Sequence, residues 1–145
     1  MSTKYSVNVD IGKRTVFVRM KGVFNDIDMR KWSEIYRQAT SPLAGKKHMI
    51  IADMRGMKAS HPSVAEIMGA EIGYARRHGV VLCAHISDDT VQRLQAARVC
   101  RQNSTGDDVT VDVVSLEEAL KVVTEASHLL DDTTPLKSIR MPLAK

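Results

Sequence analysis

The sequence contains few cysteines, few aromatic residues and no long hydrophobic run, and each shortage narrows the class of protein. Two cysteines among 145 residues argue against a disulfide-stabilised secreted scaffold. Cys83 falls in an expected strand and Cys100 in an expected helix, so we interpret both as buried thiols. No apolar stretch approaches the roughly 18 residues of a membrane span, and the first ten residues lack the apolar core of a signal peptide. We therefore expect a cytoplasmic protein without a membrane span.

Motifs for catalysis are also missing. The sequence has no glycine-rich phosphate loop, no nucleophile elbow and no metal-ligand spacing among its five histidines. His61 with Asp88 or Asp89 could form a base and its orienting carboxylate. A simpler interpretation is that His61 is a turn or cap residue and that the two aspartates lie at the start of the next helix. We therefore expect no enzyme, no cofactor and no metal ion.

A formal net charge of +4 raises the question of nucleic-acid binding. Aromatic residues make up only 4% of the chain, and the basic residues are spread along it. The densest cluster is Arg76 and Arg77 with His78, followed by arginines on the next expected helix. We interpret these residues as a solvated basic face and expect no nucleic-acid partner.

Five segments have the patterns of β-strands. Alternation from Tyr5 to Ile11 and a second extended segment from Thr15 to Val23 flank Gly12-Lys13, which predicts a β-hairpin. Continuous apolar runs at 49–52 and 80–84 are typical of strands covered on both faces. Alternation at 109–113 predicts a fifth strand.

Four helices are expected between and after these strands. Asn25 is a candidate N-cap for a helix over roughly 26–40. Residues 87–90 begin a helix that ends near Gly106, and Ser115 with Glu118 forms a capping box for the last helix. Apolar residues at helical spacing in these last two helices are Val91, Leu94, Ala97 and Cys100, and then Leu116, Ala119, Leu120, Val123, Ala126 and Leu130.

The expected order is β-β-α-β-α-β-α-β-α. A hairpin is antiparallel, whereas strands joined through a helix pair in parallel by right-handed connections. We therefore predict one α/β domain over residues 1–130, with four helices and a five-stranded mixed sheet that is antiparallel at its N-terminal hairpin and mostly parallel elsewhere. Residues 131–145 break the pattern, and we expect a flexible or surface-draped tail there.

The polar turn 55–63, between the third strand and the second helix, is where we expect a functional site. In parallel α/β sheets, ligands and partners bind the loops at the carboxyl ends of the strands. Here those loops lie at 25–26, 55–63, 87–90 and Ser115. The side chains that we expect to converge there are Arg55, Ser60, His61, Ser63, Asp88 and Asp89.

Two starts of the second helix are compatible with the sequence. Ser63 and Glu66 have the spacing of a capping box, whereas Pro62 at the first helical position makes His61 the cap. In both registers Ser63 lies in the first turn, where the positive end of the helix dipole favours a phosphate. Ser63 is therefore either a structural cap or a regulatory phosphorylation site.

A stripe of small residues follows along the same helix, because Ala65, Gly69 and Gly73 recur every fourth residue. Two interior glycines cost roughly 1 kcal/mol each relative to alanine, so a close contact should offset them. We expect that contact with the sheet or a neighbouring helix. A protein-docking surface and a wall of an apolar pocket are the alternatives.

The element order, the strand at 49–53 and the turn after it resemble the STAS family, the sulfate-transporter and anti-sigma-factor-antagonist domains, and above all its SpoIIAA-like branch. The resemblance covers roughly residues 4–127. Residues 53–56 (DMRG) share the aspartate and glycine of the family's Asp-Leu-Ser-Gly stretch. Residues 61–64 (HPSV) keep a serine of its Asp-Ser-Ser-Gly stretch. By that match Ser63 lies where the family carries its phosphorylatable serine.

The resemblance implies a non-catalytic regulatory module that binds a protein partner, such as an anti-sigma factor or a serine kinase, and that phosphorylation of Ser63 switches. A homodimer is a further expectation. SpoIIAA-like domains also share their architecture with lipid-carrying SEC14-type folds. The alternative function is therefore a carrier or sensor of a lipid or another apolar small molecule.

Overall fold

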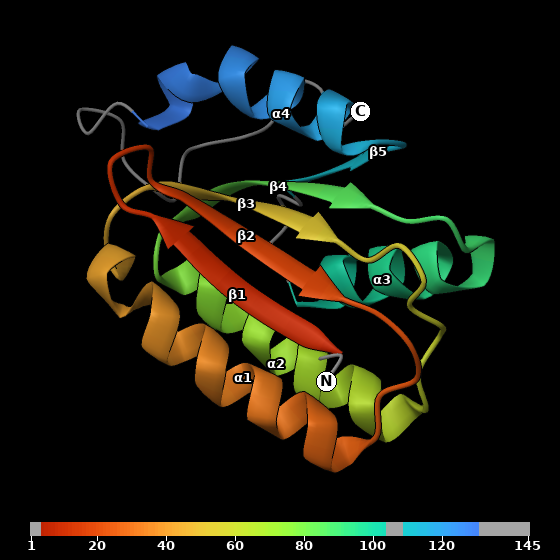
Figure 1. The fold of residues 1–145 in the computed structure, drawn as a ribbon. Helices are drawn as coiled ribbons and strands as arrows, with labels where there is room; N and C mark the ends of the chain where they lie inside the picture. The colour runs from red at the N-terminus through yellow and green to blue at the C-terminus, as the bar shows by residue number, and fades with distance from the viewer. Residues whose placement is uncertain (1–3, 104–108, 131–145) are drawn as a thin grey trace.

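A five-stranded mixed sheet lies at the centre of the computed structural model, which describes residues 4–103 and 109–130 (Figure 1). The strands lie side by side in chain order, β1-β2-β3-β4-β5. The first two form the expected antiparallel hairpin, and every later pair is parallel. The strands are β1 (Tyr5–Asp10), β2 (Thr15–Met20), β3 (His48–Asp53), β4 (Val80–Ile86) and β5 (Thr110–Val113).

Four α-helices cover the sheet, and the expected order of strands and helices is confirmed. They are α1 (Asp26–Thr40), α2 (Pro62–Arg77), α3 (Thr90–Gln102) and α4 (Leu116–Glu125). Two short 3₁₀ helices, η1 (Ser41–Leu43) and η2 (Ser127–Leu130), extend α1 and α4 and were not expected. None of the helices in the described part of the chain is long and apolar enough to cross a membrane.

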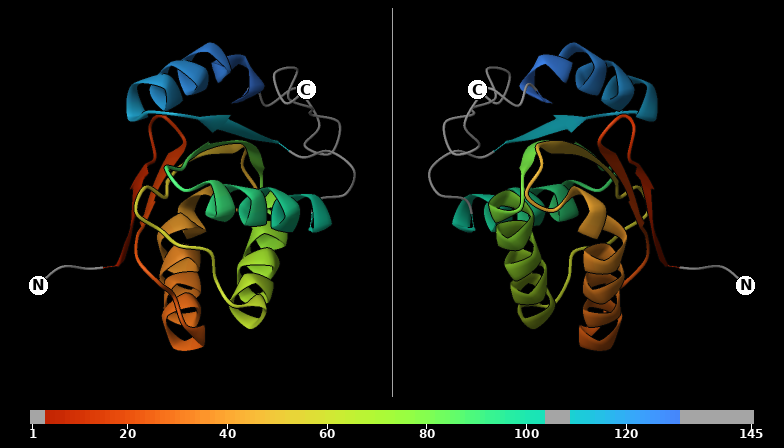
Figure 2. Two further views of the ribbon diagram at one scale, coloured as in Figure 1. Left: turned by 90° about the vertical axis from the view of Figure 1, so that its right-hand side faces the viewer. Right: turned by 90° about the vertical axis from the view of Figure 1, so that its left-hand side faces the viewer.

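The helices divide unequally between the two faces of the sheet (Figures 1 and 2). Each right-handed crossover joins neighbouring strands in the same direction, which places α1, α2 and α3 on one face. Helix α4 follows the last strand and packs on the opposite face. Both faces of the central strands are therefore buried, which explains the continuous apolar runs of β3 and β4.

Helix α3 buries a different face from the one that its apolar spacing marks, and α4 buries only part of its expected face. In α3 the buried residues are Gln92, Ala96 and Val99, whereas Val91 and Leu94 are each 65% exposed. In α4 the buried residues include Ala119, as expected, but Leu116 and Leu120 are exposed. Small residues such as Ala96 and Ala119 are buried in both helices, while leucines of both helices face solvent.

Both cysteines are half-buried thiols that form no disulfide with each other. The expectation of fully buried thiols is therefore met only in part. The expected helix end near Gly106 and the expected tail 131–145 lie outside the described residues.

Candidate functional site

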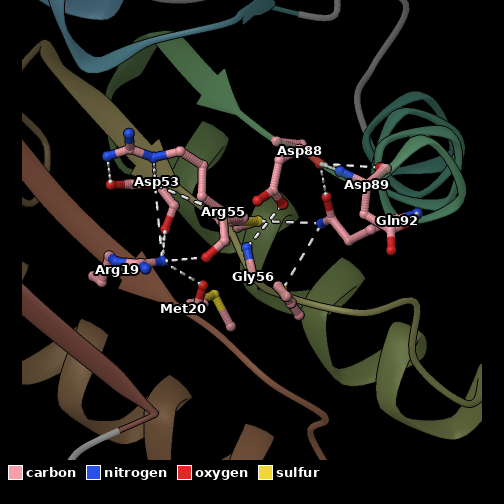
Figure 3. Close-up of polar contacts among 11 residues, drawn as sticks. Arg19, Met20, Asp53, Arg55, Gly56, Asp88, Asp89 and Gln92 are labelled. Atoms are coloured by element: carbon pink, nitrogen blue, oxygen red, sulfur yellow. Dashed lines mark hydrogen bonds and ion pairs between the residues drawn. The ribbon is translucent and has the colours of Figure 1, made fainter.

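The turn after β3 is fixed by two arginines (Figure 3). Asp53, the last residue of β3, accepts hydrogen bonds from the Arg55 Nε (2.9 Å), Nη2 (2.7 Å) and backbone N–H (3.2 Å). The Arg55 guanidinium holds the pKa of the Asp53 carboxyl below its usual value. From β2, the Arg19 Nη1 donates to the carbonyl oxygens of Asp53 (3.2 Å) and Arg55 (2.7 Å). Arg55 is therefore held in place while its side chain stays half exposed.

Gly56 joins this turn to the end of β4. Its φ of +85° lies in the left-handed region that favours glycine. In this conformation its N–H donates to the Asp88 Oδ1 at 2.9 Å, and its carbonyl accepts from the Gly22 N–H at 2.9 Å. Because β3 and β4 run in parallel and end level with each other, Asp88 reaches the turn as expected.

Asp89 is the N-cap of α3. Its carboxylate accepts from the Gln92 N–H at 3.0 Å, and this bond holds the pKa of Asp89 below its usual value. The Lys58 Nζ lies 3.3 Å from its second oxygen. The structural role expected for Asp89 is therefore observed.

Ser60 ties the turn to α3 through its backbone. Its N–H donates to the Gln95 Oε1 at 2.7 Å, and its carbonyl accepts from the Gln95 Nε2 at 2.6 Å. The Ser60 hydroxyl is buried and has no hydrogen-bond partner within the described ranges. Ser60 thus anchors the loop and does not present its hydroxyl to solvent.

The start of α2 adopts the register with His61 as the N-cap and Pro62 at the first helical position. The His61 Nδ1 accepts from the Ser63 N–H at 3.1 Å, as a cap does. The Ser63 hydroxyl is therefore not the helix cap, and the capping box with Glu66 is not formed. The Ser63 hydroxyl donates instead to the Asp26 Oδ1 at 2.8 Å. The His61 Nδ1 lies 3.0 Å from the Ser63 hydroxyl oxygen.

This bond links the first turns of two helices. Asp26 is the first residue of α1, which begins with the expected Asn25 cap and a capping box closed by Asp28. Ser63 is half-buried, and an open hollow lies beside it, lined by Asn25, Ile27 and His61 among other residues. The hydroxyl can therefore be reached from solvent.

The six expected site residues thus form separate groups at one edge of the sheet. Arg55 and Asp88 belong to the turn held by Arg19, whereas His61 and Ser63 belong to the paired helix starts. The histidine–aspartate pair considered for catalysis is not among the described hydrogen bonds, because His61 contacts Ser63 and Asp88 contacts Gly56.

Two residues that contact this region were not predicted from the sequence. Asp26 was placed in the correct loop, but its contact with Ser63 was not expected; the signal was that two helices start beside each other at the same edge of a parallel sheet. Gln92 is buried and donates to the Met54 Sδ at 3.4 Å, and its Oε1 accepts from the Ser87 hydroxyl at 2.6 Å. No local pattern distinguishes such a glutamine from an exposed one.

We compared the chain with protein-family models, with curated proteins and with solved structures, and found no match in any of them. Among the described residues, no three histidine, cysteine, aspartate or glutamate side chains gather as a metal ion would require.

Proposed function

We propose that this chain is a STAS/SpoIIAA-like regulatory module that binds a protein partner and that phosphorylation of Ser63 controls. The observation that supports this most strongly is the hydrogen bond from Ser63 in α2 to Asp26 in α1, at 2.8 Å. It places an accessible hydroxyl in the first turn of a helix, where a phosphate is stabilised by the helix dipole.

A phosphate on Ser63 would act on both helices in opposite ways. It removes the proton that the hydroxyl donates to Asp26 and adds nearly two negative charges beside that carboxylate. The backbone N–H groups at the start of α2 favour the phosphate, whereas Asp26 repels it. The phosphorylated state would therefore keep α2 intact and push the start of α1 away.

The surface that this movement changes is suited to a protein partner. Val23 and Ile27, on either side of the α1 cap, are 62% and 64% exposed. Ile27 lines the hollow, and exposed apolar side chains of this kind provide anchors for a partner. The charged groups around them provide selectivity. We propose a signalling protein such as a serine kinase or an anti-sigma factor as that partner, in the cytoplasm.

A capture experiment tests this proposal. The wild-type chain and the variants Ser63→Ala, Ser63→Asp and Ser127→Asp are used to capture proteins from the native cell. Ser127→Asp is the matched control, because Ser127 is exposed and lies at the start of η2. We expect one protein to be captured equally by wild type, Ser63→Ala and Ser127→Asp and at least fivefold differently by Ser63→Asp. Equal capture by all four chains would contradict the proposal, and capture of the chain itself would identify a homodimer.

A further inference from the structure

A cavity of about 110 Å³ lies between the sheet and the three helices on its more heavily covered face. Its walls are side chains from β2 to β5 and from α1, α2 and α3, and most of them are apolar. The cavity lies on the face of the sheet that α1, α2 and α3 cover, whereas the turn held by Arg19 and Arg55 follows the carboxyl end of β3.

Three buried polar atoms of the cavity walls have no hydrogen-bond partner among the described residues. They are the Trp32 Nε1, the Tyr36 hydroxyl and the His85 Nε2. The three residues are only 6%, 2% and 4% exposed. Buried tryptophan and tyrosine side chains usually find a partner, and an unsatisfied polar group costs about 1–3 kcal/mol. Three such atoms around one cavity therefore indicate a site built for a molecule with polar atoms of its own.

The chemistry of these atoms specifies what they can bind. The Trp32 N–H can only donate a hydrogen bond. Burial raises the pKa of Tyr36, so its phenol stays protonated and can donate as well. The two rings stack with centroids 5.5 Å apart on consecutive turns of α1. An acceptor oxygen on the ligand would satisfy the Trp32 N–H and the Tyr36 hydroxyl.

The third atom completes this arrangement from the sheet. The His85 Nδ1 lies 3.0 Å from the Asp112 Oδ1 on the neighbouring strand. An ionised carboxylate can only accept a hydrogen bond, so the Nδ1 carries a proton, and in the neutral ring the Nε2 is an acceptor. A ligand hydroxyl could donate to it.

The charged groups around the cavity favour a neutral ligand. Glu71 is buried in the wall, and its carboxylate accepts from the Arg37 Nε at 3.0 Å and from the Ser33 hydroxyl. Asp112 is the second carboxylate in the wall. An anionic ligand would face both carboxylates, and an ammonium ion would leave the donors Trp32 and Tyr36 unsatisfied.

The volume limits the size of the ligand. Pockets for drug-sized ligands measure about 300–1,000 Å³, whereas an apolar cavity of about 150 Å³ in another protein holds benzene. A cavity of about 110 Å³ therefore suits a single small ring and is too small for a lipid with two acyl chains.

We propose that this cavity binds a compact neutral molecule with an apolar body about the size of one ring and a carbonyl or hydroxyl oxygen, which accepts hydrogen bonds from Trp32 and Tyr36. A hydroxyl group on the same molecule can also donate to His85. The site does not depend on the Ser63 proposal, and its test uses no protein partner.

Trp32 makes the test specific, because it is the only tryptophan of the chain. The full chain is titrated with cyclohexanone, and the single indole N–H resonance is followed by ¹⁵N NMR. Methylcyclohexane, which has the same number of heavy atoms and no oxygen, is the matched ligand control. We expect a saturable downfield shift with cyclohexanone, with a Kd on the order of 1 mM, and at least tenfold weaker binding of methylcyclohexane.

Three variants separate the site from the fold. Tyr36→Phe removes a hydroxyl that has no partner in the described structure, so it should leave the fold intact and weaken cyclohexanone roughly fivefold. Ala97→Leu fills the cavity from α3 and should abolish the shift. Ala70→Leu, at an exposed position of α2, is the matched control and should bind as wild type does. Circular dichroism confirms that each variant is folded.

Three results would overturn the proposal. The first is a Trp32 resonance that does not saturate with cyclohexanone. The second is methylcyclohexane binding as tightly as cyclohexanone, which would mean that water satisfies the polar atoms. The third is a shift that persists in a folded Ala97→Leu chain.

Discussion

Ser63 and Asp26 come from the first turns of two helices, and their hydrogen bond makes each residue sensitive to charge on the other. The bond is charge-assisted, because a hydroxyl donates to a carboxylate. A negative charge at Ser63 would turn this attraction into repulsion. Removing the charge of Asp26 should therefore lower the stability of the chain when residue 63 is uncharged and raise it when residue 63 is negatively charged.

We predict that Asp26→Asn has opposite effects on the free energy of unfolding in the wild-type and Ser63→Asp backgrounds. In the wild-type background it weakens the acceptor and should lower the free energy of unfolding by up to about 1 kcal/mol. In the Ser63→Asp background it removes the repulsion and should raise that free energy by a similar amount. Urea unfolding of the four chains measures this coupling. A coupling energy of zero would show that the two side chains do not interact in solution.

His48 gives a pH-dependent prediction. It is buried at the start of β3, and its Nδ1 lies 2.7 Å from the Lys46 carbonyl oxygen. Burial lowers the pKa of His48 below its ordinary value of 6.5. The folded chain therefore keeps His48 neutral at a pH where the unfolded chain binds a proton. Stability from this residue is present above about pH 6.5 and is lost as the pH falls below it, by at most about 1.4 kcal/mol per unit.

His48→Asn should reduce this dependence, because the asparagine amide can still donate to the Lys46 carbonyl oxygen and does not titrate. The measurement is urea unfolding of both chains at pH 7.5 and pH 5.5. We expect the wild type to lose more stability than His48→Asn between these values. An equal loss in the two chains would show that His48 does not carry the effect.

Single residues were predictable where the signal is local. Asn25 and Ser115 cap their helices as expected, since capping depends on two or three neighbouring residues. Glu71 and Gln92 were not predicted to be buried. Their partners include Arg37, 34 residues from Glu71, and Met54, 38 residues from Gln92, and such long-range contacts exist only in the folded chain.

At the scale of elements, the stripe of small residues on α2 has a specific explanation at Gly69. A Cβ there would lie 2.4 Å from the Asn103 Nδ2, at the C-terminal end of α3. The Asn103 amide is itself held by a hydrogen bond to the Val99 carbonyl oxygen at 2.9 Å. The expected close approach to a neighbouring helix is therefore confirmed at this position.

Gly73 is different, because the atom nearest to a Cβ there would be the end of the Arg77 side chain, at 3.1 Å, which can move. The Asn103 carbonyl oxygen would lie 3.8 Å away, an ordinary van der Waals contact. We predict that Gly73→Ala stabilises the chain by about 0.5–1 kcal/mol through helix propensity. Gly69→Ala should not, because Asn103 must give up its hydrogen bond. In an Asn103→Ala background Gly69→Ala should become stabilising. Thermal and urea unfolding measure these three effects. Equal stabilisation by Gly73→Ala and Gly69→Ala in the wild-type background would refute this explanation.

The buried face of α3 could not be read from its own residues. The spacing of Val91 and Leu94 marks an apolar face, but the helix packs through Ala96 and Val99. Its orientation is set by contacts with α2 and with the turn after β3, where Gln95 bonds to Ser60. Tertiary contacts therefore override a weak local pattern.

At the scale of the molecule, the sheet was predictable because its connections permit few topologies. A hairpin followed by three helix-containing crossovers gives an antiparallel pair and three parallel pairs, as observed. The same rule places the ends of β3 and β4 together, which brings Asp88 to the turn at Gly56. The cavity was not predictable in this way, because its walls come from four strands and three helices and depend on side-chain volumes.

The two proposed sites both involve α1 and α2 but use different parts of these helices. The Ser63 site uses the first turns of these helices, and the cavity uses side chains farther along them. Protein binding around Ser63 and small-molecule binding in the cavity can therefore be measured separately on one chain.

The effect of a phosphate on Ser63 is measured most directly with a chain that carries that phosphate. The partner identified by capture is titrated calorimetrically with the unmodified chain and with a chain that carries phosphoserine at position 63. We predict Kd values that differ by at least tenfold, a difference that Asp26→Asn should reduce. Equal Kd values for the two chains would contradict the account.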